Sequence, residues 1–291
     1  MTGNQHIVLR AVIAIAVLGV VAGCGGMFTA EIIQENETVR VAGVSVYPKR
    51  LEIDRGESNN QLQAKVVPAN ASNQLVVWVS SDPSIATVDA AGAVTGGYTD
   101  GVAVLTVQSA DGEHTDSALI VVGGDPIGKK GPAGGLIFYE DVDNEQPWSF
   151  LEAAPQGWYD GGDDPEMVWS NVDDAAVGTT AQEIGTGQAN TSAIVAQEGH
   201  TESAAEAAAE LAHEHGGVTY DDWFLPSRFE LVLMWENIVN EGIGGFHDTH
   251  YWSSSESDRF WGIARFMRAD ISATLYGSKL GNHRVRPVRA F

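Results

Sequence analysis

The chain has 291 residues with 16 basic and 39 acidic side chains, a formal net charge of −23 at pH 7, and a single cysteine. One cysteine excludes an internal disulfide framework and any cysteine-based metal or redox centre. The acidic excess makes nucleic acid a poor candidate partner, because binding to phosphates depends on lysine and arginine. Acidity of this kind is typical of an exported protein that has to stay soluble.

The first 23 residues have the layout of an export signal. Arg10 precedes an apolar run without charge over residues 11–21, which is too short to anchor the chain as a membrane-spanning helix. Residues Val21-Ala22-Gly23-Cys24 resemble the bacterial lipobox, in which the cysteine receives lipid and becomes the first residue after cleavage. We therefore expect a lipoprotein signal peptide over residues 1–23, lipidation at Cys24, and a polar tether over residues 24–40.

Residues 41–122 alternate apolar and polar side chains in short runs that are separated by turn residues. Such a pattern predicts about seven strands of a small β-sandwich. Residues 77–89, 92–96 and 101–107 resemble the bacterial immunoglobulin-like (Ig-like) group 2 domain almost end to end. The resemblance implies an all-β Ig-like sandwich, with Trp78 between the sheets and a turn at Gly92, that serves as a spacer or adhesion module.

Residues 123–126 read Gly-Gly-Asp-Pro, which ends the strand pattern and predicts a linker. Beyond it, residues 134–139, 150–154, 251–253, 261–267 and 285–289 are expected strands. A capping box at Ser203 predicts an alanine-rich helix that ends at Gly216-Gly217, and a second box at Ser227 predicts a core helix over residues 229–239. Residues 127–291 are therefore expected to form an α+β domain.

Six motifs of this second domain resemble motifs of the C-terminal domain family of the Legionella collagen-like adhesin and occur in the same order. They are residues 131–139, 151–155, 185–191, 222–227, 251–256 and 285–289. The resemblance implies a C-type-lectin-like fold and a role in adhesion, through binding of glycans or host matrix; the family's namesake binds sulfated glycosaminoglycans. One departure is that many members carry a cysteine in the helix before the glycine pair, where residues 207–215 have none.

The sequence contains little evidence of a catalytic or metal-binding site. The chain has neither a Gly-x-Ser-x-Gly elbow nor a His-Glu-x-x-His motif, so we expect no enzyme activity and no cofactor. His213 and His215 near a predicted helix end, and His247 and His250 in a predicted loop, are not spaced to converge on a metal. Acidic residues at 141–145 and 160–166 could offer oxygen ligands to calcium, but without EF-hand spacing they are better explained as solvated turns.

Two hypotheses for a ligand site remain open. Aromatic side chains beside carboxylates suit a neutral sugar, because rings stack on the sugar and carboxylates accept hydroxyl protons. The residues of this first hypothesis are Trp158, Tyr159, Asp160, Asp163 and Trp169. The second is a basic face in the C-terminal stretch, formed by Arg259, Arg265, Arg268 and Arg284.

We favour pairing of the C-terminal arginines with carboxylates over a free basic face. Residues 127–291 contain 10 basic and 26 acidic side chains, and arginine is well suited to bidentate pairing. Neutral or weakly charged sugars are therefore expected to bind better than heparin.

The sequence thus predicts a lipid-anchored protein at the outer membrane or cell surface, whose C-terminal domain recognises a glycan or host-matrix ligand. The alternative is a structural envelope lipoprotein that packs against another envelope protein and has no glycan ligand. Ligand identity, oligomeric state and the membrane face that the protein occupies stay open.

Overall fold

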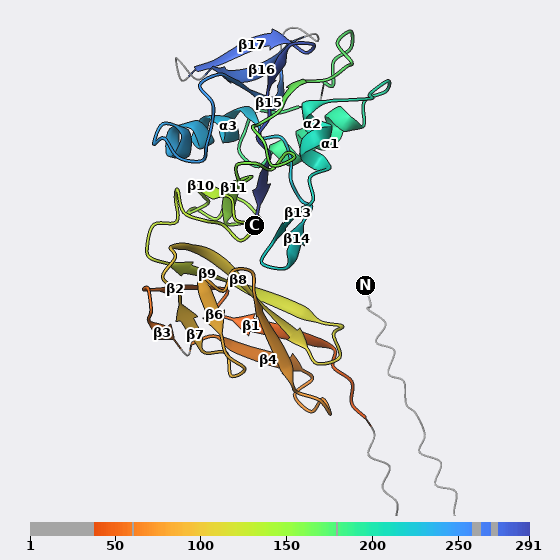
Figure 1. The fold of residues 1–291 in the computed structure, drawn as a ribbon. Helices are drawn as coiled ribbons and strands as arrows, with labels where there is room; N and C mark the ends of the chain where they lie inside the picture. Colours follow the sequence, from red (N-terminus) through yellow and green to blue (C-terminus); the bar gives the residue numbers. More distant parts are fainter. Residues whose placement is uncertain (1–37, 60, 179, 258–262, 269–272) are drawn as a thin grey trace, which may run out of the picture. The chain divides into compact units, whose positions relative to one another are not determined.

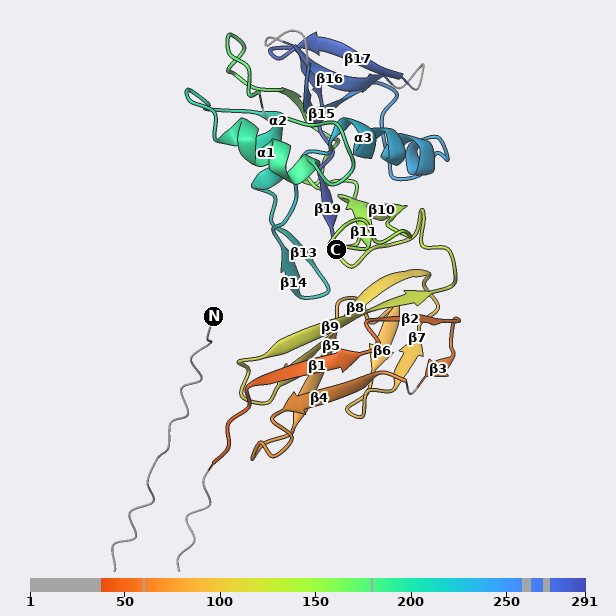
Figure 2. The same cartoon turned by 180° about the vertical axis from the view of Figure 1, so that it is seen from behind.

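The computed structural model describes residues 38–59, 61–178, 180–257, 263–268 and 273–291 (Figures 1 and 2). Cys24, the expected signal peptide and most of the expected tether lie outside these residues. Residues 38–291 form one compact unit. Among the helices in the described ranges, none has both the length and the apolar character required to cross a membrane.

Strands alone build the Ig-like segment, which we define as residues 41–122. Its main sheet has four strands in the order β2 (Arg50–Ile53), β9 (Thr115–Val122), β8 (Gly101–Ser109) and β5 (Val76–Ser80). Two smaller sheets complete it: β1 (Gly43–Tyr47) with β4 (Gln63–Val67), and β3 (Ser58–Asn59), β7 (Val94–Gly96) and β6 (Ala86–Val88). Side chains from all three sheets meet in one hydrophobic core.

The expected alternation of apolar and polar residues is confirmed on β8, whereas β5 carries apolar residues on both of its faces. Alternate residues of β8 point into the core, where Leu105 is fully buried. Trp78 packs against the same core, whereas its neighbours Val77 and Val79 are 55% and 50% exposed. The predicted turn at Gly92 has φ +88°, and a β-carbon there would lie 2.7 Å from the Leu62 carbonyl oxygen, so only glycine fits.

The C-terminal segment, residues 127–291, combines sheets with short helices. One sheet has the order β10 (Leu136–Glu140), β11 (Phe150–Ala153), β19 (Val288–Ala290). A second has the order β12 (Glu166–Val168), β18 (Asn282–Arg284), β15 (His250–Glu256), β16 (Ile263–Arg268), β17 (Ala273–Ser278). The helices are α1 (Gly187–Val195), α2 (Ala204–Ala209) and α3 (Arg228–Met234), and α3 continues as a π-helix over Trp235–Val239.

Both predicted capping boxes begin helices, but the first helix is much shorter than expected. The Ser203 side chain accepts a hydrogen bond from the Glu206 backbone N–H, yet α2 ends at Ala209. The expected helix over residues up to 215 is wrong, because His213–His215 form β13, which pairs with β14 (Val218–Tyr220). Gly216 and Gly217 have φ of +60° and +81°, and this backbone conformation permits a two-residue hairpin turn.

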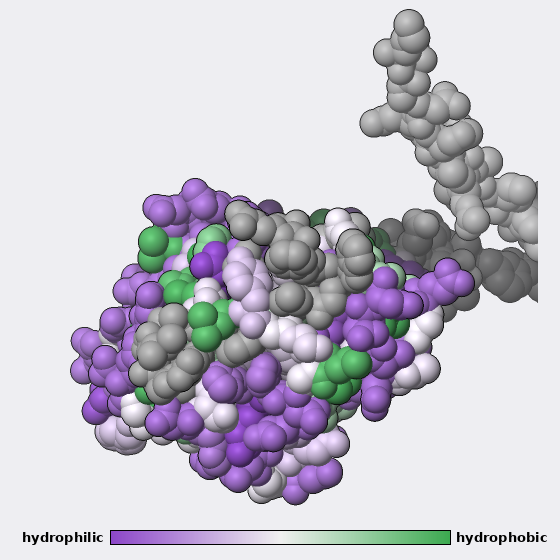
Figure 3. All heavy atoms as spheres, turned by 90° about the horizontal axis from the view of Figure 1, so that it is seen from above, coloured by the Kyte–Doolittle hydropathy of each residue, from purple (hydrophilic) through white to green (hydrophobic). Residues whose placement is uncertain are grey.

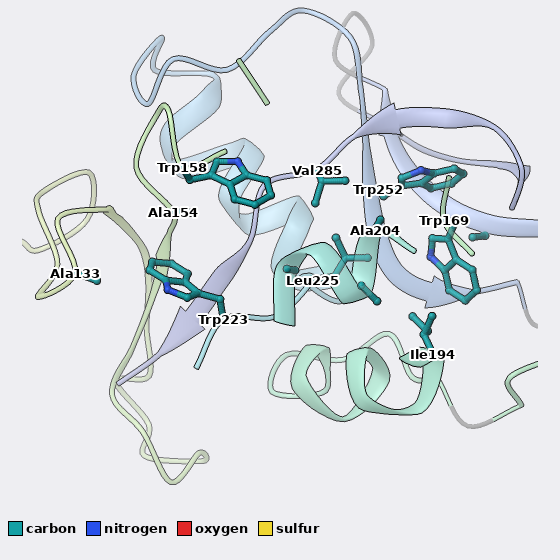
Figure 4. Close-up of a cluster of buried hydrophobic side chains, with 13 residues drawn as sticks. Ala133, Ala154, Trp158, Trp169, Ile194, Ala204, Trp223, Leu225, Trp252 and Val285 are labelled. Atoms are coloured by element: carbon teal, nitrogen blue, oxygen red, sulfur yellow. The ribbon is translucent and has the colours of Figure 1, made fainter. Parts of the chain in front are cut away.

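The second capping box is complete, and α3 presents the expected apolar face. Ser227 and Glu230 bond reciprocally, each side chain to the other residue's backbone N–H. Leu231, Met234 and Trp235 lie in a core cluster that also contains Phe138 of β10. A separate cluster gathers the small residues of α2 with four tryptophans (Figure 4).

Lys130, which follows the expected linker, connects a sheet of the Ig-like segment with a sheet of the C-terminal segment through β-bridges. Lys130 bridges to Gly101 of β8 on one side and to Leu136 of β10 on the other. Val102 and Val121, which lie on the opposite face of the main sheet from its core residues, are buried with Ile137 and Phe150. The two expected domains therefore share a small apolar cluster that strand alternation alone does not predict.

The core of the Ig-like segment gives a direct stability prediction. Leu105→Ala removes a fully buried side chain and should lower the free energy of unfolding by about 2–5 kcal/mol. Leu75→Ala is the matched control, since Leu75 is 73% exposed, and should change it by less than about 0.5 kcal/mol. Urea denaturation of both variants measures the difference; equal effects would contradict the burial assigned to Leu105.

Candidate functional site

A groove in the C-terminal segment is the best candidate site. It has a volume of about 580 Å³, and its walls come from the loop between β11 and β12, from β12, from α2 with its flanking residues, and from β18. We call it the acidic groove, because five carboxylates line it: Asp160, Glu166, Glu202, Glu206 and Glu210. Two aromatic side chains, Trp158 and Tyr159, line it as well.

Two of the five carboxylates follow from helix geometry. Glu206 lies on α2 and Glu210 at its C-terminal cap, four residues apart, so their side chains lie along the same side. Glu202 precedes the N-cap Ser203, whose backbone is extended, and therefore reaches the groove from outside the helix. The sequence analysis did not single out these glutamates, although the spacing of Glu206 and Glu210 in a predicted helix was a usable signal. No cationic side chain lines the acidic groove in the described part of the chain.

Tyr159, and not Trp158, presents the exposed ring of the groove. Tyr159 is 42% exposed and packs edge-on against Trp158, with ring centroids 5.4 Å apart. Trp158 is only 8% exposed, and its indole N–H donates a 2.9 Å hydrogen bond to Asp164 Oδ1. Trp158 therefore supports the Tyr159 ring from behind, with its own N–H already committed.

Asp164 lies at the centre of a buried network below the groove. Its Oδ1 accepts from Arg286 Nε at 2.7 Å, and its Oδ2 accepts from Arg286 Nη2 and from the Tyr251 hydroxyl, both at 2.7 Å. Burial, followed by the Asp164 charge, raises the pKa of Tyr251. The expectation that residues 160–166 form a fully solvated turn is therefore wrong at Asp164, whose side chain is 0% exposed.

The structure brings together only part of the predicted aromatic site. Trp158, Tyr159 and Asp160 line the acidic groove, whereas Asp163 lies in a neighbouring hollow and contacts His247 Nε2 at 3.1 Å. Trp169 is fully buried and donates its indole N–H to the Ser253 carbonyl oxygen. Figure 4 shows Trp169 near Ile194 and Trp252, away from Trp158, so its place in the predicted ligand site is wrong.

The described C-terminal cations are paired with acidic groups, as the sequence analysis favoured. Arg286 binds Asp164, Arg289 binds Asp222, and Lys279 binds Glu256 at 2.5 Å in a fully buried site. Arg284 donates to the Asp164 carbonyl oxygen and lies 4.0 Å from Glu166. Of the other members of the alternative basic face, Arg259 lies outside the described residues, and Arg265 and Arg268 are described only in their backbone on β16.

The histidines do not gather into a ligand set. His213 and His215 lie on β13, where burial lowers the pKa of His213 and His215 contacts Asp82 at 3.3 Å. The His250 and His283 rings lie close together at a tilted angle, with ring centroids 5.1 Å apart. Within the described ranges, no group of three or more His, Cys, Asp or Glu side chains is arranged to hold a metal ion.

Comparison with known proteins identifies the first segment. Residues 40–119 match the family model of the bacterial Ig-like domain (group 2), which confirms that part of the expected fold. The "Ig-like virion protein" of Serratia phage KSP90 is 36% identical over 121 residues, which cover 41% of this chain and 46% of the phage protein. This chain therefore matches less than half the length of that relative.

Solved structures show weak similarity. An intimin mutant from EHEC is 14% identical, with 85% of this chain and 94% of that chain aligned at a TM-score of 0.25. A xylanase from termite gut that contains a bacterial Ig-like domain is 23% identical over 27% of this chain and 20% of its own, with a TM-score of 0.20. TM-scores this low do not indicate a shared overall fold.

The buried network below the groove predicts unequal roles for two adjacent aspartates. Asp164→Asn leaves the buried Arg286 without its counter-ion and should lower the free energy of unfolding by about 3–5 kcal/mol. Asp163→Asn is the matched control: that side chain is 64% exposed, and the change should stay within about 1 kcal/mol. Chemical denaturation measures both, and similar losses would contradict the assignment of Asp164 as the buried partner.

Proposed function

We propose that the chain is a lipid-anchored recognition protein of the cell envelope or surface, with an Ig-like segment followed by a C-type-lectin-like segment. In this proposal the acidic groove binds a neutral or weakly charged glycan, and the chain has no catalytic role. The observation that carries the proposal is the composition of the groove, which is lined by five carboxylates and one exposed aromatic ring.

The groove is rich in hydrogen-bond acceptors. Five carboxylates line it, while the Trp158 N–H is bound by Asp164 and Arg284 Nη1 donates to the Asp164 carbonyl oxygen. A ligand that is rich in hydroxyl groups supplies the missing donors, and carboxylates form strong hydrogen bonds with such groups. An exposed ring such as that of Tyr159 can stack on the apolar face of a sugar.

Size and charge agree with a small polar ligand. A volume of about 580 Å³ is in the range of sites that bind small molecules. Residues 127–291 carry a net charge of −16, from 10 basic and 26 acidic side chains, which repels a polyanion such as heparin. The face seen in Figure 3 is mostly hydrophilic with small, separate hydrophobic patches, which is unlike a broad apolar docking surface.

The location rests on the sequence of the first 24 residues and on the Ig-like match. An apolar signal that ends in a lipobox supports export and lipid attachment at Cys24. The phage relative is described as a virion protein, which is consistent with an Ig-like segment in an exposed position. The cell envelope or surface is therefore the location that we propose for this groove.

A second candidate function has one specific observation in its favour. Strand β5 is the edge of the main sheet, and Val77 and Val79 project from its outer face with half of each side chain exposed. An apolar edge strand can pair with another protein. A structural envelope lipoprotein without a glycan ligand would use this edge and leave the groove empty.

Lipid attachment gives a prediction about Cys24. Cys24→Ser removes the only thiol of the chain, so the variant should remain in the aqueous phase of a detergent partition. Mass spectrometry of the wild-type chain should show a lipid-sized increment that the variant lacks. Partition of the variant into detergent with the same increment would refute lipid anchoring at this residue.

The glycan proposal is tested by screening the intact chain on an array of neutral and sulfated glycans. Tyr159→Ala should weaken binding of a neutral glycan about five- to tenfold, because stacking contributes on the order of 1 kcal/mol. Tyr98→Ala is the control, since Tyr98 is 86% exposed on the Ig-like segment and should leave binding unchanged. Tight, salt-sensitive heparin binding that is lost in Arg284→Ala and retained in Tyr159→Ala would refute the proposal.

A further inference from the structure

Glu152 is a buried carboxyl group with an unfilled hydrogen-bonding position. It lies on the central strand β11, opposite Arg289 on β19, and is 0% exposed. Its Oε1 accepts from the Ala133 backbone N–H at 3.1 Å, whereas Oε2 has no hydrogen-bond partner among the described residues. Gly131 covers Oε2 so closely that a β-carbon on this glycine would lie only 1.5 Å away.

The nearest positive charge is shared with a second carboxylate. Arg289 donates from Nε and Nη2 to Asp222 at 2.7 and 2.8 Å, a bidentate pair. Only Nη1 is directed at Glu152, and it lies 3.5 Å from Oε1. Because Asp222 is 42% exposed and Glu152 is fully buried, one guanidinium group connects a solvated acid with an unsolvated one.

This geometry favours the neutral form of Glu152 at moderate pH. Burial raises its pKa to about 7, and the attraction of Arg289 and the hydrogen bond from Ala133 offset that effect only in part. An ionised carboxylate with one unpaired oxygen is costly inside a protein. Ionisation of Glu152 should therefore strengthen the attraction between its carboxylate and the Nη1 group of Arg289.

We propose that protonation of Glu152 is a conformational switch that sets how strongly Arg289 holds Asp222. With Glu152 protonated, Arg289 binds Asp222 through both Nε and Nη2. Its guanidinium carbon then lies 4.7 Å from the centroid of the Tyr220 ring. With Glu152 ionised, Arg289 shifts toward β11, and the segment from β14 to Trp223 is held less firmly. The β13–β14 hairpin thus becomes more mobile as the pH rises.

Other titratable groups around Glu152 are few. Arg289 faces it from β19, Asp222 and Tyr220 face it from the segment that follows β13, and His213 on β13 bonds to the Ala133 backbone. His215 lies beside His213 and adds to the lowering of its pKa. Since His213 also titrates, the contribution of Glu152 has to be isolated by substituting it alone.

The sign of the pH effect follows from the direction of the pKa change. A carboxyl group whose pKa in the folded chain exceeds its ordinary value stabilises the folded chain at low pH, and this contribution is lost as the pH rises through the folded pKa. Stability of the wild-type chain should therefore fall between about pH 5 and pH 8. From a pKa of about 7 against 4.5, the unfolding constant should rise on the order of 100-fold in this window through Glu152 alone.

The test compares the intact wild-type chain with Glu152→Gln, with Glu52→Gln as a control that removes an exposed charge from β2. Urea denaturation from pH 5 to pH 8 should show the extra 100-fold change in wild type and in Glu52→Gln, but not in Glu152→Gln. The guanidinium carbon of Arg289 lies 5.9 Å from the centroid of the Trp223 ring, so Trp223 fluorescence should report the switch. In chains that contain Glu152, this fluorescence should change with a midpoint near pH 7, and in Glu152→Gln that change should be absent. Identical pH profiles for wild type and Glu152→Gln would overturn the proposal.

A second measurement keeps the proposal testable if Glu152→Gln does not fold. Carbon-13 NMR of the wild-type chain, labelled at glutamate carboxyl groups, should show the Glu152 resonance titrating near pH 7, once it is distinguished from that of Glu230, whose pKa is also raised by burial. If the Glu152 resonance titrates below about pH 5.5, Glu152 is ionised at neutral pH and the switch does not exist.

Discussion

The carboxylate of Asp164 accepts four hydrogen bonds in a site that is closed to solvent, and the position of the groove depends on this arrangement. Two of the four come from Arg286, whose Nη1 also donates to the carbonyl oxygens of Ala154 and Gly244. A buried ion pair is stabilising only when its remaining donors and acceptors are also satisfied, since desolvation of the charges is expensive. Here the Phe246 ring, 4.2 Å from the guanidinium carbon, covers what the hydrogen bonds leave open.

These contacts connect segments that are far apart in the chain. Trp158 belongs to the loop after β11, Tyr251 to β15, and Arg286 to the segment before β19. The loop between β11 and β12 is consequently fixed at its Asp164 end by groups from distant parts of the chain. The exposed ring of Tyr159 keeps its orientation because Trp158, on which it packs, cannot turn without losing its bond to Asp164.

Local signals predicted much of the fold. Period-two alternation placed the strands of the Ig-like segment, and the capping boxes at Ser203 and Ser227 placed the start of two helices. The end of α2 was not predictable in the same way, because Gly216-Gly217 terminates a helix and turns a hairpin equally well. Pairing of His213 with Tyr220 decides between these outcomes, and pairing is a tertiary property.

The candidate site was predicted in part for a similar reason. Asp163 and Asp164 are chemically identical neighbours, and only the position of Arg286, 122 residues away, separates the exposed acid from the buried one. Trp158 and Trp169 occur in the same acidic stretch and are both buried, but only Trp158 lines the groove, whereas Lys279 covers the ring of Trp169. Burial at these positions is set by long-range contacts that composition and spacing do not contain.

The loop that carries Tyr159 has a buried end and an exposed tip, and this combination favours diversification. Gly161 has φ +73° with nothing within 4 Å of where a β-carbon would lie, while Asp164, three residues later, is held by the buried network. Insertions at an exposed loop tip cost little, since the entropy of closing a loop grows slowly with its length. Homologous proteins could therefore vary the rim of the groove in length and sequence while the scaffold beneath it stays the same.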